Sequence, residues 1–183
     1  MTDSIEKVLY SKADIEEAVS RVAHDINRDY KDSGKKLVLV CILKGSLIFC
    51  SDLMRKIDRE LTVEFMKASS YGAGTTSQGT INIQLDLTLN DPENTDIIIV
   101  EDIIDSGHTL SLLVKNLKDR GAASVKTVTL LNNPYRRAAN IEPDYCGIKM
   151  TENAFVVGYG LDYNEFYRNL DYIGVLKPEI YQK

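Results

Sequence analysis

The segment "IIIVEDIIDSGHTLSLLVKNL", Ile97 to Leu117, predicts a buried strand, a polar loop and a helix. Its first four residues are apolar and β-branched, as in a parallel strand that is covered on both faces. A helix is expected from about Thr109 to Arg120, with Gly121 placed to end it. A buried strand that leads into a helix is the repeating unit of α/β folds.

The flanking segments repeat this unit. Ser11 and Asp14 predict a capping box for a helix whose apolar residues recur at helical spacing from Ile15 to Ile26, with Gly34 as a stop. Further strands are expected at 37–43, 61–69, 81–87, 125–131 and 154–160, and a further helix at about 47–57. Segments 61–69 and 81–87 have no helix between them and predict an antiparallel hairpin. The sequence therefore predicts one α/β domain, 1–183, with a mainly parallel sheet flanked by helices.

The composition argues against general affinity for nucleic acid or membranes. The 183 residues are 44% hydrophobic and 27% charged, and the net charge is −5. Nucleic acids and anionic membranes require a basic face, which this balance opposes. No segment is apolar enough to span a bilayer, and the N-terminus lacks the apolar region of a signal peptide. A cytoplasmic location is therefore expected.

The cysteines are expected to be reduced thiols. Cys41 and Cys50 lie in apolar stretches, Cys146 is the third, and no C-x-x-C occurs. A zinc site is not expected, because His24 and His108 have no ligand spacing with the cysteines.

The loop at 101–109 combines a phosphate-binding turn with acids. In an open α/β sheet, ligands bind beyond the carboxyl ends of the strands. Ser106 and Gly107 lie where the helix begins, and its unpaired N–H groups and dipole favour a monophosphate. Glu101 and Asp102 would repel phosphate, so we expect them to face sugar hydroxyls or Mg²⁺. A pentose carrying one phosphate satisfies both halves of the loop. The alternative is that the acids only cap the strand and shape a turn.

Several motifs resemble those of one enzyme family. The sequence VEDIIDSGHTL, 100–110, resembles the phosphoribosyl-pyrophosphate signature of type I phosphoribosyltransferases. LKGS at 43–46, SSYG at 69–72 and FVVGYGLDYNEFYRNL at 155–170 follow the order found in hypoxanthine-guanine phosphoribosyltransferases. The resemblance covers nearly the whole chain. It implies the type I phosphoribosyltransferase fold, with a hairpin lid and a small hood region. It also implies transfer of ribose 5-phosphate from phosphoribosyl pyrophosphate to N9 of hypoxanthine or guanine, a purine salvage reaction that gives IMP or GMP plus pyrophosphate.

The resemblance implies roles for four acids. Glu101 and Asp102 match residues that hold the ribose hydroxyls, directly or through Mg²⁺. Asp162 matches a carboxylate that binds a second Mg²⁺, directly or through water. Asp105 matches the residue beside purine N7, the proposed proton acceptor. The chemistry agrees, because N9 attacks an anomeric carbon with oxocarbenium character and the purine must lose a proton.

Phosphate contacts are implied in three places. The run Asp105, Ser106, Gly107, His108 and Thr109 matches the 5′-phosphate loop. Lys44 and Gly45 match the pyrophosphate-binding turn, in which the family often has a cis peptide before the lysine. Arg168 matches a second pyrophosphate contact, where a guanidinium fork suits paired phosphate oxygens.

The base pocket contains a departure from the family. Phe155 is implied to stack on the purine and Val156 to contact the base edge through its backbone, although the residues alone favour a plain core strand. Asn133 stands where the family normally has a lysine that donates to the purine 6-oxo group. The amide of asparagine can donate to an oxo group or accept from an amino group. A transferase with altered base choice is therefore one alternative.

Residues 69–79, SSYGAGTTSQG, are expected to form a lid. Small polar residues join the two hairpin strands, and the spacing of a Gly-rich nucleotide loop is absent. In the family, the pair corresponding to Ser70 and Tyr71 lies near the pyrophosphate, and closure excludes competing water. The alternative is an inert hairpin tip.

A regulatory protein on the same fold is a further alternative. Such proteins sense nucleotides while binding RNA or DNA, which requires a basic face and, for a DNA-binding repressor, an added domain as well. The acidic balance and the joint presence of Asp105, Lys44 and Arg168 favour an enzyme. The resemblance also implies a homodimer or homotetramer.

Overall fold

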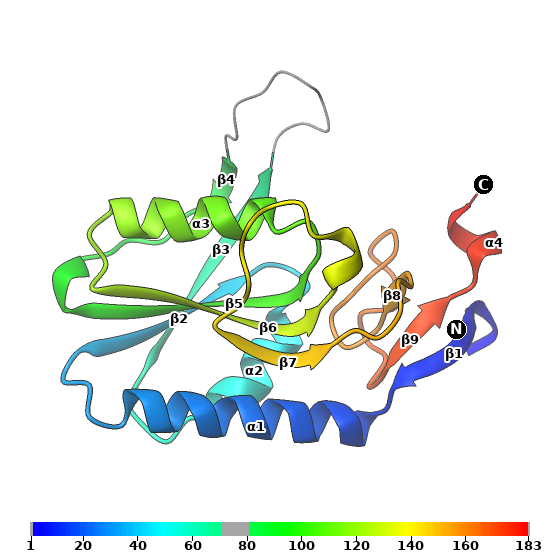
Figure 1. The fold of residues 1–183 in the computed structure, drawn as a ribbon, viewed down its shortest axis with the longest axis horizontal. Helices are drawn as coiled ribbons and strands as arrows, with labels where there is room; N and C mark the ends of the chain where they lie inside the picture. Colours follow the sequence, from blue (N-terminus) through cyan, green and yellow to red (C-terminus); the bar gives the residue numbers. More distant parts are fainter. Residues whose placement is uncertain (1, 71–80, 183) are drawn as a thin grey trace.

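A six-stranded sheet forms the centre of the computed structural model, which describes residues 2–70 and 81–182 (Figure 1). The strand order is β4-β3-β2-β5-β6-β7. The strands are β2 (Lys36–Ile42), β3 (Thr62–Ser70), β4 (Ile81–Leu85), β5 (Thr95–Ile104), β6 (Ser124–Asn132) and β7 (Tyr145–Lys149). Strands β3 and β4 pair antiparallel, and the other neighbours pair parallel. The predicted mainly parallel sheet and its hairpin are therefore confirmed.

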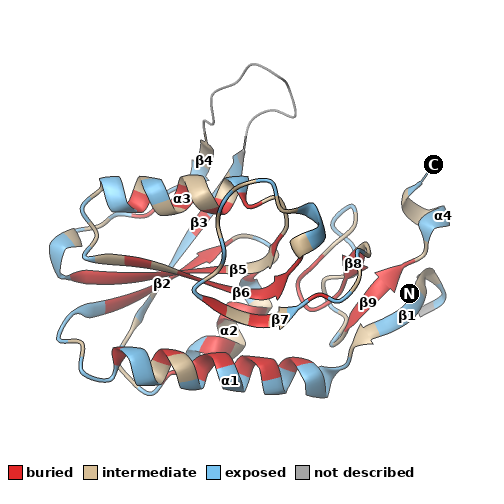
Figure 2. Cartoon of the chain, in the orientation of Figure 1, coloured by how far each residue is buried: buried red, intermediate tan, exposed pale blue. Residues whose placement is uncertain are grey.

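Helices cover both faces of this sheet. Helices α1 (Lys12–Tyr30) and α2 (Leu47–Met54) lie on one face, and α3 (His108–Asp119) lies on the other (Figure 1). Because side chains alternate along a strand, Leu39 and Cys41 of β2 pack toward α1 and α2, whereas Val40 packs toward α3. Figure 2 shows the resulting pattern, with β5 and β6 buried and the outer faces of the helices exposed.

The N-terminus of α1 is capped as the sequence predicts. The Asp14 N–H donates to Ser11 Oγ at 3.3 Å, and the Ser11 N–H donates to Asp14 Oδ2 at 2.8 Å. This reciprocal pair satisfies two backbone donors that a helix start leaves without partners. The helix ends at Tyr30, before the predicted stop at Gly34.

A second, smaller sheet lies beside the carboxyl ends of the central strands (Figure 1). It contains β1 (Ile5–Tyr10), β9 (Ile173–Leu176) and β8 (Val156–Val157), all antiparallel, and the chain ends in α4 (Pro178–Tyr181). We call this sheet the hood. Its residues Val156 and Ile173 belong to the same buried cluster as β2 and β5, so the hood is packed onto the central core.

Three local predictions were wrong. The strand expected at 154–160 contains two residues, because Gly158 and Gly160 have φ of +102° and +101° and turn the chain. The helix expected at 47–57 ends at Met54. The alternation of Leu61, Val63 and Phe65 predicts that these three side chains share the buried face of β3, but Phe65 is 40% exposed, while its neighbour Met66 is fully buried.

The structure also shows how the cysteines are placed and whether any described helix could cross a membrane. Cys41 and Cys50 are buried as expected, Cys146 is half-buried, and all three are free thiols. Within 2–70 and 81–182, no helix has the length and apolar character needed to cross a bilayer.

Candidate functional site

A cavity of about 250 Å³ opens at the carboxyl ends of β2 and β5 and at the start of α3. Its lining includes Gly45, Glu101, Asp102, Asp105, Ser106, Gly107 and Thr109. Parallel strands bring their carboxyl ends to one edge of the sheet, which explains why segments 43–45 and 101–109 meet there. The structure therefore brings together the acids and the phosphate turn that the sequence predicts.

Two acids in this cavity form no direct ion pair among the described residues, although the positive charge of Arg168 opposes the rise in the pKa of Asp102. Glu101 and Asp102 are half-buried, and no lysine or arginine in the described part of the chain forms an ion pair with either. Burial, and then the charge of Asp102, raise the pKa of Glu101 well above its usual range. Burial also raises the pKa of Asp102 to about 6. The ionised carboxylates are therefore disfavoured until a cation or hydroxyl donors reach them.

The turn after β2 is packed tightly against these acids. The Leu43–Lys44 peptide is cis. A Cβ on Gly45 would lie 1.8 Å from Asp102 Oδ2, and a Cβ on Gly160 would lie 2.0 Å from the Gly45 carbonyl oxygen. Only glycine fits at both positions, so the loop after β8 closes directly over the turn that carries Lys44.

The phosphate turn is shaped by Gly107 at the start of α3. Gly107 has φ of +80°, and α3 begins at His108, whose side chain is exposed. The segment after β6 supports the turn, because the Ala138 and Ala139 N–H groups donate to the Ser106 carbonyl at 3.0 and 2.8 Å. The turn therefore presents the positive end of the α3 dipole to the cavity.

Asp105 is held by residues that follow β6. Asn133 Nδ2 donates to Asp105 Oδ1 at 2.8 Å, and Arg136 Nη1 donates to Oδ2 at 3.2 Å. Arg137 Nη1 donates to the Asp105 carbonyl at 2.9 Å. The Asn133 side-chain oxygen accepts from the Tyr135 N–H, and Asn133 is 1% exposed. The residue that replaces the family lysine thus contacts the predicted proton acceptor.

The predicted pyrophosphate residues form a cluster with carboxylates. Arg168 donates to the Gly160 carbonyl at 2.9 Å and forms ion pairs with Asp162 at 2.9 Å and Glu165 at 3.2 Å. Glu165 also accepts from Lys44 Nζ at 2.8 Å. These hydrogen bonds, first that from Lys44 and then that from Arg168, lower the pKa of Glu165. The Nε of Arg168 is buried and has no partner among the described residues.

Phe155 and Val156 lie at the edge of the hood. The Phe155 ring stacks on Tyr181 of α4, with centroids 4.7 Å apart, and meets Tyr163 edge-on at 5.8 Å. Val156 is buried and pairs with Val175 of β9. Ser70 ends β3, but its side chain lies outside the described residues, as do Tyr71 and the rest of the predicted lid.

The described residues contain no preformed metal site. No group of three His, Cys, Asp or Glu side chains in 2–70 or 81–182 is arranged to hold a metal ion. The carboxylate oxygens of Glu101 and Asp102 are nevertheless the donor type that Mg²⁺ prefers. They fit a metal ion whose other ligands come from a bound substrate and water.

A larger cavity, of about 750 Å³, lies at the opposite edge of the sheet, near the amino ends of β2 and β3. Its Arg59 guanidinium donates to the backbone carbonyls of Tyr30, Ser33 and Lys35. Because these structural bonds occupy the guanidinium, the smaller cavity is the better candidate for chemistry.

Sequence reasoning missed Arg136, Arg137 and Glu165. The two arginines directly follow the NNPY segment, and Glu165 lies inside the quoted 155–170 motif. Their contacts with Asp105 and Lys44 span distant parts of the chain, so no local pattern indicates them.

Comparisons with known proteins agree with this arrangement. The family model of the phosphoribosyl transferase domain matches residues 7–164. The chain is 46% identical over 181 residues to a hypoxanthine-guanine phosphoribosyltransferase from Staphylococcus aureus, and the match covers 99% of both proteins. A crystal structure of a hypoxanthine phosphoribosyltransferase from Staphylococcus aureus has a TM-score of 0.92 at 46% identity, covering 100% of this chain and 97% of that chain.

A longer relative contains a similar segment. The chain is 47% identical over 183 residues to the bifunctional protein TilS/HprT of Listeria monocytogenes. The match covers 100% of this chain and 28% of that protein, so the chain spans less than a third of the relative's length.

Proposed function

The chain belongs to the phosphoribosyltransferase family, and within it to the hypoxanthine-guanine phosphoribosyltransferases, and we propose that it catalyses their reaction. In this reaction, ribose 5-phosphate passes from phosphoribosyl pyrophosphate to N9 of hypoxanthine or guanine. The products are IMP or GMP and pyrophosphate, which is a step of purine salvage. The observation that carries the proposal is the cavity in which Glu101 and Asp102 lie beside a phosphate turn that contains Asp105.

Binding of the sugar uses both halves of the 101–109 loop. Glu101 and Asp102 accept hydrogen bonds from the ribose hydroxyls, while the start of α3, with Ser106 and Thr109, binds the 5′-phosphate. Glu101 and Asp102 would hold one Mg²⁺ and Asp162 a second, directly or through water, and the metal would supply positive charge that stabilises the leaving pyrophosphate. The Lys44–Gly45 turn and Arg168 bind the pyrophosphate.

Asp105 accepts the proton that the purine loses. Its carboxylate lies in the cavity and is held in place by Asn133 and Arg136. The nearby carboxylates stabilise positive charge that develops on the sugar ring as pyrophosphate leaves. General base catalysis of this type contributes roughly 10²–10⁴-fold to turnover.

Base selection involves Phe155, Val156 and Asn133. We propose that the Phe155 ring stacks on the purine and that the Val156 backbone contacts its edge. Asn133 Nδ2 carries two hydrogens, of which Asp105 accepts one. The second is the donor that we assign to the 6-oxo group. Because Asn133 replaces a lysine, altered base choice is the second candidate function.

The remaining proposals rest on the family and on the shared core. We propose a single domain across 1–183, because hood residues and the central sheet share one buried cluster. A homodimer or homotetramer and a cytoplasmic location are proposed from the family resemblance.

The test is an assay with Mg²⁺, phosphoribosyl pyrophosphate and one base at a time. We expect nucleotide from hypoxanthine and guanine, and much less product when a chelator removes the metal. Xanthine and adenine complete the base panel. Product from adenine alone would contradict the 6-oxopurine assignment, and no product from any base would contradict the enzyme proposal. Asp105→Asn is the matched control for background activity.

A further inference from the structure

The Glu165 carboxylate forms hydrogen bonds with both cations that are assigned to pyrophosphate, Lys44 and Arg168. Glu165 Oε2 accepts from Lys44 Nζ at 2.8 Å and from Arg168 Nη2 at 3.2 Å. Lys44 belongs to the turn after β2, whereas Arg168 belongs to the loop after β8. A single oxygen therefore connects the two segments through their positive charges, as an oxygen of a bound anion would.

The backbone around Glu165 holds it in this position. Asn164, Glu165 and Tyr167 have φ of 49°, 70° and 74°, a left-handed region that L residues adopt at a cost. The Glu165 N–H donates to Asp162 Oδ2 at 2.9 Å, and Tyr163 and Phe166 exchange two backbone hydrogen bonds at 3.2 and 3.0 Å. The bonds of this turn therefore maintain a strained conformation that presents the carboxylate to Lys44 and Arg168.

The Glu165 carboxylate and a bound pyrophosphate would compete for Lys44 and Arg168. Both are anions that need the same donors, and like charges at hydrogen-bond separations repel strongly. The Glu165 side chain is 63% exposed and the Lys44 side chain 52%, so the carboxylate has room to leave the cations. Pyrophosphate carries more charge and more acceptor oxygens than one carboxylate, which favours the exchange.

We infer that Glu165 is an internal counter-anion that occupies Lys44 and Arg168 when pyrophosphate is absent and competes with it for them. The inference rests on the proposed function, because it takes the two cations as pyrophosphate ligands. Its consequence is weaker binding of the pyrophosphate group and faster release of pyrophosphate after transfer. Weakening a product complex in this way favours turnover over tight binding.

The test compares Glu165→Gln with wild type in calorimetric titrations with pyrophosphate and Mg²⁺. Glutamine keeps the length of the side chain and removes its charge. We expect Glu165→Gln to bind pyrophosphate about 2–10-fold more tightly, as removal of two partly exposed ion pairs implies. Glu17→Gln, the same change on the exposed face of α1, is the matched control and should bind as wild type does.

Steady-state kinetics give an independent readout. The KM for phosphoribosyl pyrophosphate should fall with the pyrophosphate Kd, while the KM for hypoxanthine should stay unchanged, because the Glu165 carboxylate bonds to Lys44 and Arg168 and not to a residue assigned to the base. A general structural defect would raise both. Glu165→Ala provides a second variant with the same expected direction.

Three outcomes would count against these ideas. Equal or weaker pyrophosphate binding by both Glu165 variants overturns the counter-anion and indicates that Glu165 orients the cations for the ligand. A rise in the KM for hypoxanthine also overturns it. Wild-type protein that does not bind pyrophosphate overturns the proposed function itself, which separates the two failures.

Discussion

The two ends of strand β5 carry carboxylates in opposite settings. At the amino end, Asp96 is buried and accepts hydrogen bonds from Ser124 Oγ at 2.6 Å and Ser33 Oγ at 2.8 Å. At the carboxyl end, Glu101 and Asp102 form no direct ion pair among the described residues, and burial raises their pKa values. The same strand therefore has an acid held by two hydroxyl groups at one end and two acids whose charged forms are disfavoured at the other.

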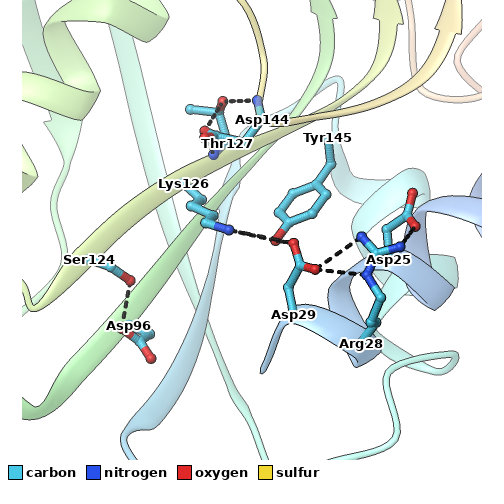
Figure 3. Close-up of polar contacts among 9 residues, drawn as sticks. All are labelled: Asp25, Arg28, Asp29, Asp96, Ser124, Lys126, Thr127, Asp144 and Tyr145. Carbon is cyan, nitrogen blue, oxygen red and sulfur yellow. Dashed lines mark hydrogen bonds and ion pairs between the residues drawn. The ribbon is translucent and has the colours of Figure 1, made fainter. Parts of the chain in front are cut away.

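The satisfied acids extend across the amino edge of the sheet (Figure 3). Asp29 of α1 accepts from the Tyr145 hydroxyl at 2.9 Å and lies 3.6 Å from Lys126 Nζ. The hydrogen bond from Tyr145 is the main reason that the pKa of Asp29 is lowered. Asp144 accepts from the N–H and the hydroxyl of Thr127, at 2.8 and 2.9 Å. These contacts connect α1, β6 and β7.

The difference separates structural acids from functional ones. At the amino edge, acids with partners on neighbouring elements stabilise the fold, whereas the partners of Asp105 hold that carboxylate in place for a ligand. Acids without partners cost folding free energy, and a ligand that brings cations or hydroxyl donors recovers it. The same substitution should therefore have opposite effects on stability at the two ends of the sheet.

The largest expected effect concerns Asp105. Asp105→Asn removes the proton acceptor while it keeps the size of the side chain, so kcat should fall by roughly 10²–10⁴-fold. The KM for phosphoribosyl pyrophosphate should change much less, because the α3 turn and the other acids remain. Steady-state kinetics with hypoxanthine measure both values. Unchanged turnover would remove the proton-acceptor role.

The second prediction concerns Asp102, whose negative charge should lower the free energy of unfolding. Its folded pKa of about 6 exceeds the ordinary value of 3.8. The ionised form is therefore disfavoured by folding, and the penalty is present above about pH 6 and absent below about pH 4. Asp102→Asn should raise the free energy of unfolding by on the order of 1–3 kcal/mol near neutral pH, without Mg²⁺.

Denaturant unfolding at several pH values measures this gain. The advantage of Asp102→Asn over wild type should shrink as the pH falls from 7 toward 4, and the variant should lose activity. A variant less stable than wild type at neutral pH would show that Asp102 has a structural role like that of Asp29.

The third prediction concerns Asp29 at the amino edge of the sheet, where the same substitution should lower the free energy of unfolding instead of raising it. Asp29→Asn should lower the free energy of unfolding by at most about 1 kcal/mol, because the lost contacts are partly exposed. The folded pKa of Asp29 lies below 3.8, so its contribution is present above the unfolded value and is lost as the pH falls through the folded one. Activity per folded molecule should equal that of wild type. A loss of turnover would indicate that the amino edge takes part in function.

The fourth prediction, an effect on kinetics similar in size to that on stability at Asp29, concerns Asn133. In Asn133→Lys, an ammonium near Asp105 is a stronger donor to a 6-oxo group than an amide. We expect kcat/KM for hypoxanthine to rise by about 3–10-fold, with no gain for adenine. The comparison of the two bases is the internal control. No change with either base would show that the side chain at 133 does not contact the purine.

Local patterns predicted the elements whose causes are local. The β-branched run of β5, the Ser11 capping box and the β3–β4 hairpin depend on nearby residues, and all three are confirmed. Strand β1 escaped prediction because it exists through pairing with a distant partner, Ile5 with Leu176. The strand predicted at 154–160 was too long, because the chain turns at Gly158 and Gly160, where the backbone of Tyr172 and of Gly45 leaves no room for a side chain.

The candidate site likewise contains residues that a local motif predicts and contacts that depend on distant parts of the chain. Glu101, Asp102 and the α3 turn lie within nine residues and could be predicted as a unit, since one strand-loop-helix segment carries them. The partners of Asp105 and of Lys44 come from after β6 and after β8. Such contacts depend on how loops pack at the edge of the sheet, which a local motif does not specify.

The most direct test is a calorimetric titration of phosphoribosyl pyrophosphate with Mg²⁺ into wild type, Asp102→Asn and Asp29→Asn. If the unpaired acids of β5 bind the sugar and its metal ion, Asp29→Asn binds as wild type does and Asp102→Asn loses most of the affinity. Wild-type affinity in Asp102→Asn would contradict the assignment of the carboxyl end of β5 as the binding site.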